Sequence, residues 1–126
     1  MSAKGTYSTR YYARAYPAVH IKFVHPVYPQ LSDETEALID SGASGTLIPQ
    51  STVKKLALRA INETIMKDYQ GNITGKKPVY YVTVVIDSLI FNVNAAETEG
   101  NAIIGRDIMN KLTTTLYGKQ QKWEMK

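Results

Sequence analysis

The sequence predicts a closed, all-β or mainly β domain, and three observations support this fold class. Apolar side chains at Val19, Ile21 and Phe23 recur at every second position, the period of a half-buried strand. Residues 79–86, VYYVTVVI, are all β-branched or aromatic, as residues in strands often are. Only two short stretches show helical spacing, which leaves most of the chain to short strands and the turns between them.

Residues 1–16 are expected to form an N-terminal arm. Four tyrosines lie between positions 7 and 16, with Arg10 and Arg14 among them. Tyrosine interleaved with arginine can stack on single-stranded nucleic acid, or the rings can pack on the domain or on a partner subunit. The second interpretation is favoured because no phosphate-cradling glycine loop accompanies the rings.

The remaining elements follow from apolar runs and the turn residues that separate them. Two prolines indicate a loop over residues 25–33, and glycines indicate the mobile tip of a long hairpin over residues 70–76. Short helices are expected over residues 49–57 and 106–112. Strands are expected over residues 18–24, 37–40, 47–48, 61–69, 79–86, 90–95, 102–104, 113–116 and 121–125.

Composition limits the classes of function. The 126 residues fit a single domain, 1–126, and contain no cysteine, which excludes disulfide scaffolds, thiolate metal sites and cysteine nucleophiles. His20 and His25 would not converge on one face, so neither a metal nor a cofactor is expected. The net charge of +4 comes without blocks of like charge, so no nucleic-acid partner is expected. No apolar run reaches the roughly 18 residues of a membrane span, and the N-terminus lacks a signal peptide's apolar core. A soluble, cytoplasmic protein without a membrane partner is therefore expected.

The stretch ALIDSGASGTLIP, residues 37–49, carries the clearest chemistry. Asp40 ends one apolar run and is separated from the next by small residues. Two carboxyl groups about 3 Å apart share one proton, so one can activate a water while the other protonates a carbonyl oxygen. No other aspartate of the chain is followed by Ser/Thr-Gly, so such a pair would need two copies facing across a two-fold axis. The alternative is a turn aspartate that caps its own loop.

This stretch, taken together with NAIIGRDIMNKL at residues 101–112, resembles the paired signature of the retropepsin-like aspartic proteases. These are single-domain, homodimeric relatives of pepsin, and both ends of the chain are more similar to their stand-alone prokaryotic members than to the viral ones. The resemblance covers essentially the whole chain. It implies a closed β-barrel with one short C-terminal helix, a flap hairpin near residues 69–76, and a homodimeric endopeptidase that cuts a peptide or protein substrate without a cofactor.

The resemblance also assigns roles by position. Asp40 would be the catalytic aspartate of each subunit, with Ser41 in a hydroxyl network between subunits and Gly42 binding a substrate backbone amide. Gly105 would pack behind the loop, and Arg106 would brace the loop and the dimer. Viral members commonly carry an acid at the position of Ser44, so the partner of Arg106 is left open, with Asp107 near it in sequence. Substrate contacts are expected from Ala43, Ser44, Gly45, Leu47, Gly71, Asn72, Ile73 and Ile103.

Three hypotheses for the function remain at this point. The first is a homodimeric aspartic endopeptidase. The second is a dimer of the same fold that binds or scaffolds peptides with little turnover, and the third is a nucleic-acid-associated protein that uses the N-terminal arm. The intact Asp-Ser-Gly-Ala favours the first, because a pure binder has no need of a carboxylate there. The mild net charge disfavours the third.

Overall fold

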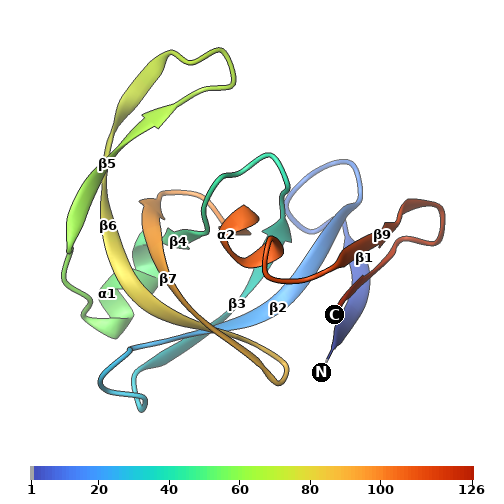
Figure 1. The fold of residues 1–126 in the computed structure, drawn as a ribbon, viewed down its shortest axis with the longest axis horizontal. Coiled ribbons are helices and arrows are strands. Elements are labelled where there is room, and N and C mark those ends of the chain that lie inside the picture. Colours follow the sequence, from blue (N-terminus) through green and yellow to red (C-terminus); the bar gives the residue numbers. More distant parts are fainter. Residues whose placement is uncertain (1) are drawn as a thin grey trace.

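The computed structural model describes residues 2–126 and consists mainly of β-strands (Figure 1). The mainly β class predicted from the sequence is therefore confirmed. The strands are β1 (Ala3–Ser8), β2 (Tyr16–Val24), β3 (Ser32–Ile39), β4 (Leu47–Pro49), β5 (Asn62–Lys67), β6 (Ile73–Ile86), β7 (Leu89–Thr98), β8 (Ala102–Ile104), β9 (Thr114–Tyr117) and β10 (Lys122–Met125). The helices are α1 (Gln50–Leu56), α2 (Arg106–Met109) and the 3-10 turn η1 (Gly118–Gln120).

Hydrogen-bonded pairings join six of the described strands in a ring, in the order β2, β3, β8, β4, β7 and β6, with β6 returning to β2. Buried side chains of these strands, such as Ile21, Phe23 and Val84, pack in one core cluster with residues of both α-helices. The closing contact is short, because only Lys22–Val24 of β2 pairs with Thr83–Val85 of β6. Closure into a barrel therefore stays a prediction.

The centre of the sheet brings the two halves of the sequence signature together. β3 and β8 run parallel, with Ile39 opposite Ile104, so both strands end at the same edge. β4 lies between β8 and β7, antiparallel to the first and parallel to the second. The residues that follow β3 and β8 are Asp40 and Gly105, and this topology makes them neighbours although they lie 65 positions apart in the sequence.

The predicted long hairpin is formed by β5 and β6, and it projects beyond the rest of the domain (Figure 1). β6 begins at Ile73, six positions before the predicted strand, because its first half pairs with β5. The register shifts between Met66 and Lys67, next to the loop that joins the strands. β6 continues into β7 through the predicted turn at Asp87 and Ser88, where Asp87 has a φ of 51°.

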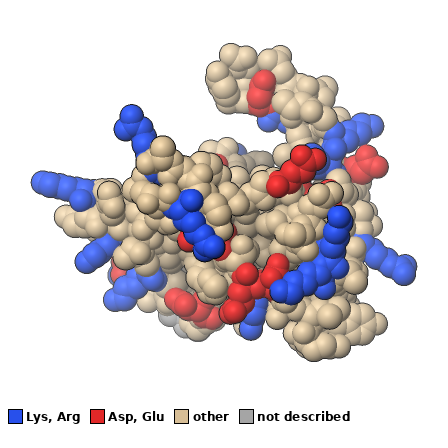
Figure 2. Space-filling view, turned by 180° about the vertical axis from the view of Figure 1, so that it is seen from behind, with Lys and Arg blue, Asp and Glu red and all other residues tan. Residues whose placement is uncertain are grey.

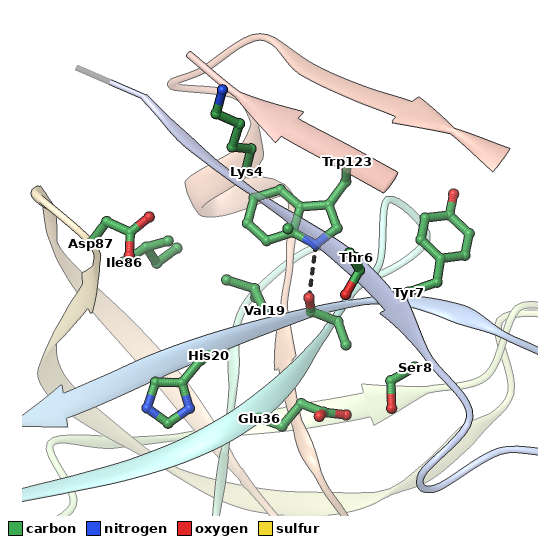
Figure 3. A pocket seen from close by; sticks show the side chains of 12 residues that line it. Lys4, Thr6, Tyr7, Ser8, Val19, His20, Glu36, Ile86, Asp87 and Trp123 are labelled. Atoms are coloured by element: carbon green, nitrogen blue, oxygen red, sulfur yellow. Dashed lines mark hydrogen bonds between the residues drawn. The ribbon is translucent and has the colours of Figure 1, made fainter. Parts of the chain in front are cut away.

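The N-terminal segment is built into the sheet of its own chain. The first four residues of β1 pair with β10, and its last two pair with β2. Gly5 is needed here, because a Cβ at this position would lie 2.6 Å from the ring of Trp123. The indole Nε1 of Trp123 donates a hydrogen bond of 2.8 Å to the carbonyl oxygen of Ala18 (Figure 3). β1, β2 and β10 are thus held together by one buried tryptophan.

Both α-helices lie where the sequence predicts them, but both are shorter. α1 ends at Leu56, and Ala57 adopts a left-handed conformation that stops the helix. α2 ends at Met109, after which turn hydrogen bonds continue to Leu112. Within the part of the chain that the structure describes, no helix has the length and apolarity needed to cross a membrane.

Candidate active site

The loop between β3 and β4 places Asp40 at the edge of the sheet. The backbone N–H of Asp40 donates to the carbonyl oxygen of Ile104 at 3.0 Å, which ties the start of the loop to β8. The half-buried carboxylate accepts a hydrogen bond of 2.8 Å from the N–H of Gly42 through Oδ1. This is the bond that the loop-capping interpretation predicts. It occupies one carboxylate oxygen, and no described residue donates to the other, Oδ2.

Gly42 lies close to this carboxylate for a steric reason. A Cβ on Gly42 would lie 3.1 Å from Oδ1 of Asp40, which is tighter than an ordinary contact. Because Gly42 lacks a Cβ, the carboxylate of Asp40 can fold back and accept a hydrogen bond from the N–H of Gly42. The side chains of Ser41 and Ser44 are exposed on the same loop.

Gly105 and Arg106 support this loop from behind. Gly105 is buried, and a Cβ there would lie 2.5 Å from both the carbonyl carbon and the carbonyl oxygen of Gly45. The backbone N–H of Arg106 donates to the carbonyl oxygen of Ala43 at 2.9 Å. Its guanidinium Nη1 donates to the carbonyl oxygen of Ser41 at 2.8 Å. The partner of Arg106, which the sequence left open, is thus a backbone carbonyl of the loop.

A second brace, formed by Thr46 and Asp107, joins the end of the loop to α2, and it was not predicted from the sequence. Thr46 is 1% exposed, and its hydroxyl donates to Oδ1 of Asp107 at 2.8 Å, while its N–H donates to Oδ2 at 3.1 Å. The N–H of Gly105 donates to the Thr46 hydroxyl at 3.4 Å. Two features of the sequence could have indicated this brace. Thr46 is a hydroxyl residue just before a strand, and Asp107 is an acid in the first turn of a helix.

A cleft of about 750 Å³ opens beside Asp40. The structure places seven of the predicted site residues in its lining, namely Asp40, Gly42, Ala43, Ser44, Gly45, Leu47 and Ile103. Residues 61–67, which contain β5, also line it, although the sequence analysis assigned them no role in the site. Ile65 of β5 and Ile61, just before it, are exposed apolar side chains, but this exposure is a property of the structure and no residue type in the sequence marks it.

The other predicted contact residues lie outside this cleft. Gly71, Asn72 and Ile73 are exposed at the tip of the β5–β6 hairpin, and Gly71 has a φ of 86°. Their role in binding stays a prediction, as does that of Ser41, whose side chain does not line the cleft.

The hairpin tip is organised by Asp68. Its Oδ1 accepts hydrogen bonds of 2.9 Å from the N–H groups of Gln70 and Asn72. These backbone donors, above all the N–H of Asn72, lower the pKa of Asp68 below its usual value. The tip is therefore a turn held by an ionised carboxylate.

A second hollow, of about 280 Å³, lies away from the loop, between β1, β2 and the turn after β6 (Figure 3). None of the predicted site residues lines it. Its charged or ionisable side chains are Lys4, Tyr7, His20, Glu36 and Asp87. Within residues 2–126 no three His, Cys, Asp or Glu side chains group as a metal site would require.

Some arginine and tyrosine side chains of the N-terminal arm contact one another. Arg10 lies over the ring of Tyr11 at 5.2 Å from its centroid, and Tyr12 packs edge-on against Tyr16. The hydroxyl of Tyr16 donates to Glu36, and burial together with this bond raises the pKa of Tyr16. Figure 2 shows acidic and basic side chains mixed over one face of the molecule. The expectation of no nucleic-acid partner stays a prediction.

Comparisons with known proteins agree with this geometry. A family model described as aspartyl protease matches residues 32–108, which include both the loop and its supports. A retropepsin-like aspartic protease from Rickettsia conorii superposes with a TM-score of 0.58 at 13% identity, over 99% of this chain and 91% of that one. The simian foamy virus (mac) protease has a TM-score of 0.54 at 16% identity, over 74% and 91% of the two chains. EIAV protease, in complex with the inhibitor HBY-793, has a TM-score of 0.54 at 16% identity, over 85% and 93%. At these identities the likeness to the solved structures shows the fold alone. A search of the curated proteins found no match to the sequence.

Proposed function

This chain belongs to the aspartyl protease family and has a retropepsin-like fold, and from this we propose that it is an aspartic endopeptidase whose active site is shared by two copies of the chain. The observation that carries the proposal is the position of Asp40. Its carboxylate stands at the edge of a cleft of about 750 Å³, with Oδ1 held by Gly42 and Oδ2 without a donor in the described chain.

The proposed mechanism follows from two such carboxylates brought face to face. An isologous dimer places Asp40 of each copy across the two-fold axis, where the pair holds one proton. The ionised carboxylate takes a proton from a water, which attacks the scissile carbonyl carbon, while the protonated one donates to the carbonyl oxygen. As the tetrahedral intermediate collapses, one hydroxyl returns a proton to the carboxylate that had donated one. The C–N bond breaks, and the leaving amine takes the proton that the other carboxyl group had accepted from the water. Ser41, exposed next to Asp40, would contact the partner subunit.

The cleft favours an extended peptide as the substrate. Its walls are the Asp40 loop and β5, and β5 presents alternating side chains as a strand does. A peptide in this space could form main-chain hydrogen bonds as an added strand. The β5–β6 hairpin would then act as a flap, with Gly71, Asn72 and Ile73 at its tip closing over the peptide.

A second candidate is a dimer that binds peptides with little turnover. The hydrogen bond from Gly42 to Asp40 supports this candidate, because it gives the carboxylate a role in stabilising its own loop that needs no catalysis. The two candidates share the cleft and differ only in whether Asp40 takes part in proton transfer.

The test is the variant Asp40→Asn. Asparagine keeps an oxygen that can accept from Gly42, so we expect an unchanged fold and a loss of about 10²- to 10⁴-fold in peptide cleavage. Cleavage is measured with a diverse peptide library between pH 4 and 7, with and without a pepstatin-type transition-state mimic. Because coupled carboxyl groups titrate as a pair, we expect an acidic optimum, below about pH 6. Asp87→Asn, in the turn after β6, is the matched control and should retain full activity.

Mixing the two proteins tests whether the site is shared. After subunit exchange, equal amounts of wild type and Asp40→Asn leave about one quarter of random dimers with both aspartates. The activity of the mixture should be about one quarter of that of wild-type protein at the same total concentration. A fall to one half would indicate that each chain works alone, and full activity of Asp40→Asn itself would refute the mechanism.

A further inference from the structure

A third hollow, of about 430 Å³, adjoins the cleft. It shares Ser44, Gly45 and Asn94 with the cleft, so the cleft continues past the end of the Asp40 loop. Its lining consists of Ser44, Gly45, Asn92, Val93, Asn94, Asp107 and Lys111. An extended peptide lying in the cleft beside Ser44 can therefore project a side chain into this hollow.

Two acceptor side chains of the hollow, Asp107 and Asn92, already accept hydrogen bonds from this chain. The single acidic side chain there, Asp107, accepts from the hydroxyl and the N–H of Thr46 and from the N–H of Ile108. Oδ1 of Asn92 accepts a hydrogen bond of 2.7 Å from the hydroxyl of Thr83. Neither side chain needs a further donor from a ligand.

The donor groups, in contrast, remain available. Lys111 is exposed, and none of the ion pairs in the described part of the chain includes it. With its Oδ1 engaged by Thr83, Asn92 keeps its Nδ2 for a ligand. An ammonium group beside an amide donor fits a carboxylate.

From this arrangement we propose that the hollow is a distal substrate subsite that selects an acidic side chain of the peptide, with Lys111 as the residue that determines this specificity. The inference rests on the proposed function for the placement of the peptide in the cleft. Asp107 keeps its negative charge and reduces the size of the preference, but its oxygens accept from Thr46 and Ile108, so Lys111 is the charged group left to bind a peptide carboxylate.

The test uses peptide binding, so that it does not depend on turnover. Pairs of fluorescent peptides, identical except for Glu or Gln at one position, are bound to the Asp40→Asn protein at pH 6, where a peptide glutamate is ionised. Scanning the pair along the peptide should find one position at which Glu binds about three- to tenfold more tightly than Gln. Lys111→Glu should abolish or invert that ratio. Lys119→Glu, the same charge change in η1, should leave it unchanged.

The outcomes separate the two proposals. A Glu-to-Gln ratio near one at every position, or a ratio that persists in Lys111→Glu, would overturn the subsite. Wild-type protein that binds peptides with the expected ratio but cleaves none would overturn the protease while the subsite stands. If the wild-type protein cleaves peptides but binds Glu and Gln peptides equally well at every position, the subsite is overturned while the protease stands.

Discussion

Replacing Gly105 by alanine should damage both the stability and the activity of the protein, through one added methyl group. Gly105 has a φ of −98° and a ψ of −171°, which any residue can adopt, so backbone strain plays no part. The added Cβ would instead lie 2.5 Å from the carbonyl carbon and oxygen of Gly45 and 3.0 Å from the carbonyl oxygen of Ala43. Because ordinary carbon contacts begin near 3.5 Å, the loop must retreat by about 1 Å.

The magnitude follows from three contributions. Overpacking of this kind costs about 1–3 kcal/mol. Weakening of the hydrogen bond from the N–H of Arg106 to Ala43 adds about 1 kcal/mol. The lower entropy of the unfolded alanine chain offsets about 0.4–1 kcal/mol. We therefore expect a net loss of about 1–3.5 kcal/mol in the free energy of unfolding. We also expect a fall of up to about 10²-fold in kcat/KM, since the retreating loop carries Asp40.

Urea denaturation and peptide cleavage measure the two effects. Gly100→Ala is the matched control, because its Cβ would lie 3.6 Å from the Thr98 hydroxyl, an ordinary contact. That variant should keep its activity and be at least as stable as the wild type. If the two alanine variants differ by less than about 0.5 kcal/mol in unfolding free energy, the role assigned to Gly105 is wrong.

Two further perturbations test the supports of the site and the hairpin. Thr46→Val keeps the shape of the side chain but removes the hydroxyl between Asp107 and Gly105, and should lower the free energy of unfolding by about 1–3 kcal/mol in urea denaturation. Thr46→Ser, which keeps the hydroxyl, should recover most of this loss. A valine variant of wild-type stability would contradict the role of the hydroxyl. Folding lowers the pKa of Asp68 below its ordinary value of 3.8, so the hydrogen bonds of its ionised form stabilise the hairpin tip at any pH above 3.8. This stabilisation is lost as the pH falls through the lower pKa of the folded state. The NMR amide signals of Gln70 and Asn72 should therefore stay constant from pH 7 to 4 and shift below it, and Asp68→Asn should remove that step; signals unchanged down to pH 2 would exclude the role of Asp68.

The elements that the sequence predicted best are those in which side chains themselves decide the structure. The β-branched run of β6 and the Asp87-Ser88 turn are examples, because packing and turn preference leave a direct mark on residue type. β3 was predicted too short, since its polar first half is held by the backbone ladder with β2, which needs no particular side chain.

The supports of the site were harder to predict for a related reason. Arg106 binds a backbone carbonyl, and every residue carries one, so no residue type marks the partner. Thr46 and Asp107 lie 61 positions apart, and only the pairings of β8 with β3 and with β4 bring their segments together. The contribution of β5 to the cleft depends on the curvature of the hairpin, which the sequence does not express.

The pairing of β1 with β10 has a consequence for the order in which the chain folds. Thr6 pairs with Lys122, 116 positions later, so this contact closes nearly the whole chain, and contacts that distant form slowly. During synthesis β1 is made first and stays without its main partner until the last strand appears. Trp123, the only tryptophan of the chain, becomes buried over Gly5 in that same step. Its fluorescence is thus a natural reporter for the completion of folding.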